Sequence, residues 1–174
     1  MFFYYFCLLN KVFSKSVLTI DSNSFEGFRH EIRMVTKSKL TIPSLINESV
    51  KKYSDKTSLV FVGEEIYTYQ QMGEDINQLA DRLIELGVTK GDKIALLSGN
   101  MPNWGVAFFA ISIAGGIVVP ILPDFHEKEI HSIIEHSEAK MLFVSEALYK
   151  NISKETADLI ERMILVDKFA MIPK

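Results

Sequence analysis

The feature that most constrains the fold of this chain is the alternation of short apolar runs with longer amphipathic runs after Thr41. Lys93–Leu97, Ile117–Pro120 and Met141–Val144 are apolar almost throughout and too short for helices, which is typical of strands buried on both faces. Ile164–Val166 is predicted as a further strand. Because strands that alternate with helices form parallel sheets, the sequence predicts an α/β layered fold with a mainly parallel sheet and flanking helices.

The clearest helix pattern follows Thr68. Thr68 and Gln71 have the spacing of a capping box, and Gly87 is a typical left-handed stop. The apolar positions between them recur three or four residues apart, as on one side of a helix, and are Met72, Ile76, Leu79, Leu83 and Leu86.

Four more helices are predicted, over residues 43–54, 104–114, 124–137 and 153–163. We expect Asn100 to cap the second of these, and Asp124 with Glu127 to begin the third. The second helix is apolar almost all round and should therefore be buried.

Outside these helices, the sequence predicts a hairpin near the start of the domain and a loop at its end. Thr57–Val62 and Ile66–Thr68 are predicted as a hairpin that turns at Gly63–Glu64, and the last residues, 168–174, as a loop.

The first forty residues are set apart from the predicted domain. Met1–Leu9 is apolar, but a membrane-spanning helix needs roughly 20 such residues. No positive segment precedes it, which argues against a signal peptide, while a buried strand or a membrane-surface anchor would fit. Since Met34 opens a segment typical of a protein start, residues 1–40 are predicted as a leader of open status and residues 41–174 as one domain.

Composition excludes several classes of function. The net charge is −3 and no basic stripe runs along the chain, which argues against nucleic-acid binding. The single cysteine, Cys7, excludes an internal disulfide and a cysteine-built zinc site. We expect a cytoplasmic protein, with peripheral membrane contact through Met1–Leu9 as an alternative.

Residue patterns alone predict no catalytic, cofactor-binding or metal-binding residue. The chain has no G-x-x-x-x-G-K-[ST] motif, and no G-x-G-x-x-G follows a predicted strand. His126, His131 and His136 are spaced by five, which separates neighbouring rings by about 140° around a helix. We therefore expect His131 on a solvated helix face beside Glu127 and Glu135, and Trp104 in the core.

One stretch resembles a known family. From Gly87 to Pro123 the chain has a Gly-Asp turn into a strand, then Asn-x-Pro-x-Trp, then Ala-Gly-Gly and a strand that ends in Pro. In this order and spacing it resembles the AMP-forming acyl-CoA synthetases of the adenylate-forming superfamily. The similarity covers about Thr41 to Val166 and is closest to the long-chain fatty acid–CoA ligases. The motif residues are Gly91-Asp92, Asn100 to Trp104, Ala114 to Gly116 and Pro120.

The resemblance implies that the chain is the N-terminal part of a large ligase domain. Such a ligase activates a fatty acid with ATP and Mg²⁺ and transfers it to coenzyme A, using motifs that lie later in the family's sequence. No catalytic, cofactor-binding or metal residue carries over to these 174 residues, so the chain alone is expected to be inactive. The alternatives are a non-catalytic α/β binding module, or one half of a split ligase whose remainder is its partner.

Overall fold

The structure, a computed structural model, describes residues 41–60 and 66–173. The predictions for Met1–Leu9, Met34 and the turn Gly63–Glu64 concern residues outside these ranges. The helices of the described part are α3 (Ile42–Tyr53), α4 (Tyr69–Glu85), α5 (Pro102–Ile113), α6 (Glu127–Ser137), α7 (Glu146–Tyr149) and α8 (Lys154–Leu159). Its strands are β1 (Thr57–Leu59), β2 (Tyr67–Thr68), β3 (Lys93–Leu97), β4 (Ile117–Ile121), β5 (Met141–Val144), β6 (Arg162–Leu165) and β7 (Ala170–Ile172).

The main sheet confirms the predicted α/β class. Its described strands run in the order β4-β3-β5-β6-β7. The first four are parallel, and β7 is antiparallel to β6. Ala95 of β3 lies opposite Val119 on one side and Leu142 on the other, so β3 is a central strand. Separately, β1 and β2 pair antiparallel, as predicted for the hairpin.

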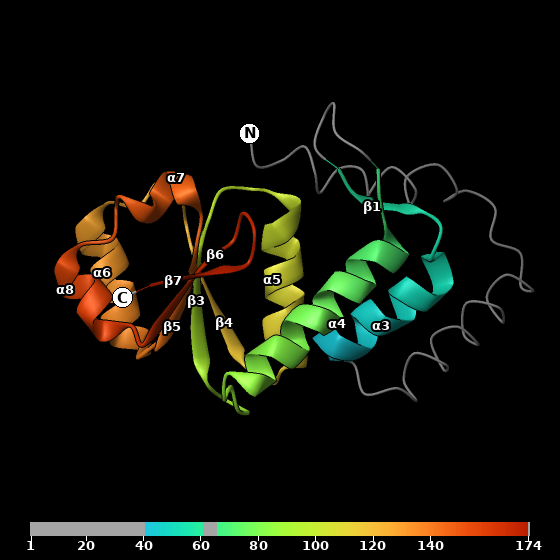
Figure 1. Cartoon of the computed structure of the whole chain (residues 1–174), viewed down its shortest axis with the longest axis horizontal. Helices are drawn as coiled ribbons and strands as arrows, with labels where there is room; N and C mark the ends of the chain where they lie inside the picture. Colours follow the sequence, from blue (N-terminus) through green and yellow to red (C-terminus); the bar gives the residue numbers. More distant parts are fainter. Residues whose placement is uncertain (1–40, 61–65, 174) are drawn as a thin grey trace, which may run out of the picture. The chain divides into compact units, whose positions relative to one another are not determined.

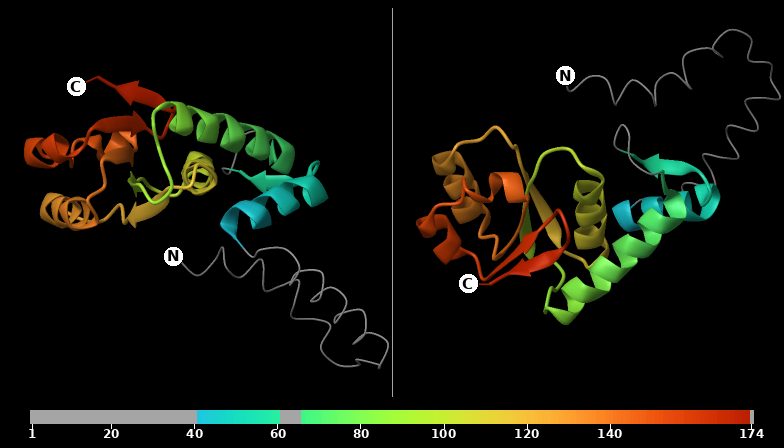
Figure 2. Two further views of the ribbon diagram at one scale, coloured as in Figure 1. Left: turned by 90° about the horizontal axis from the view of Figure 1, so that it is seen from below. Right: turned by 45° about the horizontal axis from the view of Figure 1, so that its top comes forward.

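Helices cover both faces of the sheet, and alternate residues of each inner strand supply two apolar clusters. Ile94 and Leu96 pack into the cluster that holds residues of α4 and α5. Ala95 and Leu97 pack into the cluster that holds residues of α6. Figure 1 shows α4 and α5 on one side of the sheet and α6 and α8 on the other. Figure 2 shows α4 lying beside α3 in both views.

The long helix α4 forms for the predicted reasons. Thr68 Oγ1 accepts a hydrogen bond from the Gln71 N–H at 3.2 Å, and Gln71 Oε1 accepts from the Thr68 N–H at 2.9 Å. Gly87 then has a φ of +90°, the left-handed conformation expected after the helix. Of the predicted apolar positions, four are buried and Leu86 is half-buried.

Two predicted helix caps are wrong. Pro102 occupies the first turn of α5, so Met101 is the N-cap and Asn100 lies one residue too early. In α6 the N-cap is His126, because the Glu129 carboxylate reaches back and accepts from the His126 N–H at 2.8 Å. Asp124 and Glu127 therefore do not begin that helix as a capping pair.

The C-terminal third also departs from prediction. The expected helix over 153–163 ends at Leu159, because Ile160 takes an extended conformation and is fully buried just before β6. The short helix α7 was not predicted. The expected loop over 168–174 contains β7, which Phe169, with a φ of +49°, turns back alongside β6.

Burial of α5 and β4 is less complete than predicted. In α5 only Val106, Ala107, Ala110 and Ile111 are buried, and the remaining side chains are half-buried. In the described sheet β4 is an edge strand, so Ile117 remains 51% exposed. Within the described ranges, every helix falls short of the length and apolar character that crossing a membrane requires.

Candidate functional site

The carboxyl ends of the parallel strands form the edge at which ligands of open α/β sheets usually bind. The side chain of Asn103, in the first turn of α5, reaches across this edge to the segment after β6. Its side-chain amide donates to the carbonyls of Val166 and Asp167, at 2.9 and 3.0 Å. The Asp167 carboxylate accepts from the Glu146 N–H at 2.8 Å. These contacts tie the loops after β3, β5 and β6 together.

Other polar groups at this edge also hold the chain in place. The Ser145 N–H donates to the Leu97 carbonyl, and the Val166 N–H to the Val144 carbonyl, each at 3.0 Å. The Ser98 hydroxyl is buried and donates to the Gly99 carbonyl at 2.9 Å. The edge is therefore a braced scaffold and presents no activated nucleophile among these groups.

Metal ligands do not cluster in the part of the chain that the structure describes. Among residues 41–60 and 66–173, no three histidine, cysteine or acidic side chains lie close enough together to hold a metal ion. The Asp167 carboxylate is already engaged by a backbone N–H. No step of a nucleotide-dependent reaction is therefore assigned to these residues.

His131 was placed wrongly from the sequence. Instead of facing solvent between Glu127 and Glu135, it is half-buried, with Nδ1 3.0 Å from Thr156 Oγ1 of α8. Thr156 is fully buried and also lies 2.9 Å from the Ser153 hydroxyl. The contact joins α6 to α8 and is structural. The available sequence signal was Ile134, an apolar residue three positions after His131 and therefore on the same side of the helix.

Trp104 contacts the core but is not fully buried in it, although the sequence predicted that it would be. It is half-buried against the cluster of α4 and α5 and stacks on Phe108, with ring centroids 5.3 Å apart. Asn103 was not singled out by sequence reasoning. The available signal was its position in the first turn of a helix that directly follows a buried strand.

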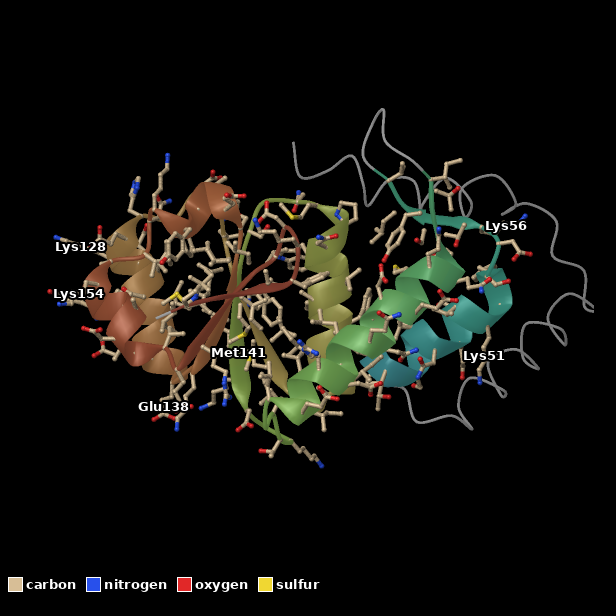
Figure 3. The ribbon with its side chains drawn as sticks, viewed as in Figure 1. Lys51, Lys56, Lys128, Glu138, Met141 and Lys154 are labelled. Carbon is tan, nitrogen blue, oxygen red and sulfur yellow. The ribbon has the colours of Figure 1, made fainter. Side chains whose placement is uncertain are left out.

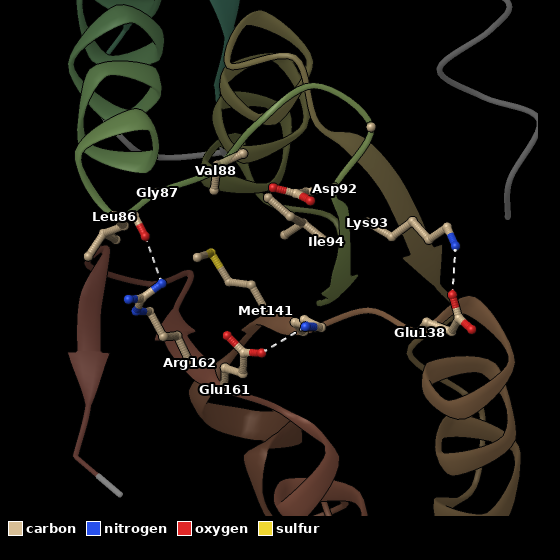
Figure 4. A pocket seen from close by; sticks show the side chains of 12 residues that line it. Leu86, Gly87, Val88, Asp92, Lys93, Ile94, Glu138, Met141, Glu161 and Arg162 are labelled. Carbon is tan, nitrogen blue, oxygen red and sulfur yellow. Dashed lines mark hydrogen bonds and ion pairs between the residues drawn. The ribbon is translucent and has the colours of Figure 1, made fainter.

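The opposite edge of the sheet carries a hollow of about 720 Å³, at the amino ends of β3, β5 and β6 (Figure 4). Two ion pairs lie on its rim, Lys93–Glu138 at 3.3 Å and Lys140–Glu161 at 3.1 Å. In Figure 3 Glu138 lies at one end of the sheet, while Lys128 and Lys154 point outward from α6 and α8.

Two further charged groups line the hollow. Arg162 donates from Nη1 to the Leu86 carbonyl at 2.7 Å. Asp92 accepts from the Thr89 N–H at 2.7 Å and from the Thr89 hydroxyl at 2.9 Å. These two hydrogen bonds, the backbone one first, hold the pKa of Asp92 below its usual range.

The similarity of this chain to known proteins shows its family. The model of the family described as "AMP-binding enzyme" matches residues 46–173. The chain belongs to the AMP-binding enzymes. As an AMP-binding enzyme segment it corresponds to the N-terminal portion of the acyl-CoA ligases, as the motifs from Gly91 to Pro120 predict.

Two curated relatives illustrate the relationship. The chain is 33% identical over 129 residues to 4-hydroxybutyrate–CoA ligase 2 of Metallosphaera sedula, a match that covers 74% of this chain and 23% of the relative. It is 26% identical over 137 residues to the long-chain-fatty-acid–CoA ligase of Bacillus subtilis, covering 78% and 24%. The chain therefore spans about a quarter of the length of these ligases.

Solved structures of the family share the fold. The coronafacic acid ligase of Pectobacterium brasiliense matches with a TM-score of 0.69 at 18% identity, over 74% of this chain and 26% of that one. The O-succinylbenzoate coenzyme A synthetase of Bacillus subtilis, solved with AMP, matches with a TM-score of 0.65 at 20% identity, over 76% and 34%. The parallel sheet with flanking helices is thus the architecture of N-terminal domains of adenylate-forming enzymes.

Proposed function

We propose that this chain is the N-terminal part of an AMP-dependent ligase that activates a long-chain fatty acid with ATP and passes it to coenzyme A. The observation that carries this proposal is the family match over residues 46–173, joined to relatives that are themselves CoA ligases. The long-chain assignment rests on the motifs from Gly91 to Pro120 and on the Bacillus subtilis relative.

The same proposal holds that the 174 residues do not catalyse the reaction by themselves. Adenylyl transfer depends on positively charged groups and backbone donors aimed at the reacting phosphate. At the carboxyl edge, the Asn103 amide and the Asp167 carboxylate are already engaged in bracing the loops. The chain's role in this proposal is to supply a scaffold to the rest of a ligase.

Domain limits, partners and location form part of the proposal. We infer that residues 41–174 form one domain, and the two clusters that α3 through β7 share on the faces of one sheet support this. Its partners are the remainder of the ligase and, through it, the fatty acid. The proposed location is the cytoplasm, with membrane contact limited to the surface.

A chimaera tests the scaffold role. Residues 46–173 would replace the matching segment of the Bacillus subtilis long-chain ligase, and palmitate-dependent release of pyrophosphate from ATP would be measured. We expect turnover, and expect Leu96→Asp within the insert to abolish it, because Leu96 is fully buried in the sheet. A soluble chimaera without turnover contradicts the scaffold role.

A further inference from the structure

The hollow at the amino edge of the sheet has an apolar floor. Leu86 and Val88, from the segment after α4, line it together with Ile94 of β3 and Met141 of β5. Val88, Ile94 and Met141 are buried in the adjoining cluster. Figure 4 shows Met141 reaching into the space between Val88, Ile94 and Arg162. A ligand in this hollow would therefore lay an apolar part against these side chains.

Among the described residues of the rim, one cation has no ion pair with a carboxylate. Lys93 and Lys140 each pair with a glutamate. Arg162 has no ion pair within the described part of the chain, and its hydrogen bond goes to the Leu86 carbonyl at 2.7 Å. A guanidinium carries five N–H donors in a planar fork, so this contact leaves most of them available. Half-buried and anchored at one nitrogen, the fork is held in place over the apolar floor.

We propose that this hollow binds a small organic monoanion, a single carboxylate with a short apolar tail, through the Arg162 guanidinium. The planar fork matches the two oxygens of a carboxylate, while the tail lies against Met141 and Ile94. The volume of about 720 Å³ falls within the ordinary range for small-molecule sites.

The charges on the rim select a monoanion over a phosphate. Asp92 also lines the hollow, and its carboxylate is ionised at neutral pH as aspartates ordinarily are, while the Thr89 hydrogen bonds lower its pKa further. Glu138 and Glu161 line the hollow as well, so repulsion grows with each negative charge on a ligand, and an anion with a single charge is disfavoured least. The site lies at the amino ends of the strands, away from the edge where ligands of α/β sheets usually bind, and so is separate from the proposed ligase chemistry.

Arg162 has a competing structural role, since a basic side chain can satisfy the last carbonyls of a helix. That role needs a single donor to the Leu86 carbonyl. A lysine could also supply it, although without the planar fork. Arg162→Lys therefore separates anion binding from helix capping.

The test follows the methyl resonance of Met141 in the full 174-residue chain, with ¹³C-methyl methionine and Met141→Leu to assign the peak. Octanoate is the probe, and octanol and octylamine are its neutral and cationic counterparts. We expect a saturable shift with octanoate and at least tenfold weaker binding of octanol and octylamine. Arg162→Gln should weaken octanoate binding about tenfold and Arg162→Lys several-fold. Lys154 is an exposed cation of α8 that does not line the hollow, so Lys154→Gln should leave the affinity for octanoate unchanged.

Three results would overturn the proposal: no shift of Met141 at millimolar octanoate, equal binding of octanol and octanoate, or unchanged affinity in Arg162→Gln. A loss of dispersion in the methyl spectrum would show that Arg162→Gln does not fold. The test then rests on Arg162→Lys, in which unaltered octanoate affinity would show that the guanidinium fork does not bind the carboxylate. A chimaera without ligase activity would leave this result standing, since the assay does not involve ATP.

Discussion

At the scale of single residues, Gly87 decides how α4 ends. Its φ of +90° is a conformation that residues with a side chain rarely adopt, while a Cβ at this position would meet nothing within 4 Å. Backbone strain, partly offset by the lower entropy of the unfolded chain with alanine, therefore sets the cost of adding a methyl group.

Gly87→Ala should lower the free energy of unfolding by about 1 kcal/mol. Gly99→Ala is the matched control, because Gly99 also has open space around it but does not have a positive φ. Urea unfolding followed by circular dichroism measures both. Equal midpoints for the two variants would show that the left-handed conformation at Gly87 carries no cost.

Asp92 gives the stability a dependence on pH. Hydrogen bonds from Thr89 depress the folded-state pKa of Asp92 below its unfolded value of about 3.9. Its contribution is therefore present above the unfolded pKa and lost as pH falls through the folded one.

The stability difference between the wild type and Asp92→Ala should shrink as the pH falls below about 4. Unfolding midpoints measured from pH 7 to pH 3 test this, with Asp124→Ala, another exposed aspartate, as control. A difference that stays constant across the range would mean that the Thr89 contacts do not stabilise the fold.

At the scale of elements, the sequence pattern correctly predicted the helices and strands whose bounds depend on local residues. The bounds of β3 and β5 match the prediction, as do the body and both ends of α4. The C-terminal third differs from the prediction. Ile160 lies in a sequence context typical of a helix, but it adopts an extended conformation just before β6. Pairing across the sheet decides such positions, and one sequence does not reveal it.

The capping box of α4 is the element-scale feature most open to test. Thr68→Ala removes the oxygen that accepts from the Gln71 N–H and should cost about 1 kcal/mol. Thr68→Ser keeps that oxygen and should restore most of the loss. Thermal unfolding of the three proteins checks this, and equal melting temperatures for Ala and Ser would contradict the capping role.

At the scale of the whole molecule, the sequence predicted the family better than it predicted any site. The motifs from Gly91 to Pro120 identified an AMP-binding scaffold, because turns and buried strands leave a local signature. The brace from Asn103 to Val166 joins residues 63 apart, and only the folded sheet brings them together. The hollow beside Arg162 escaped prediction for the same reason, since segments from four parts of the chain line it.

The central claim is that these residues are a ligase scaffold that does not catalyse alone. In the most direct test, the purified 174-residue chain is incubated with ATP, Mg²⁺ and palmitate, and acyl-AMP and pyrophosphate are measured. The Bacillus subtilis long-chain ligase is the positive control. We expect no product above a protein-free blank. Acyl-AMP that forms in proportion to the concentration of this chain would contradict it.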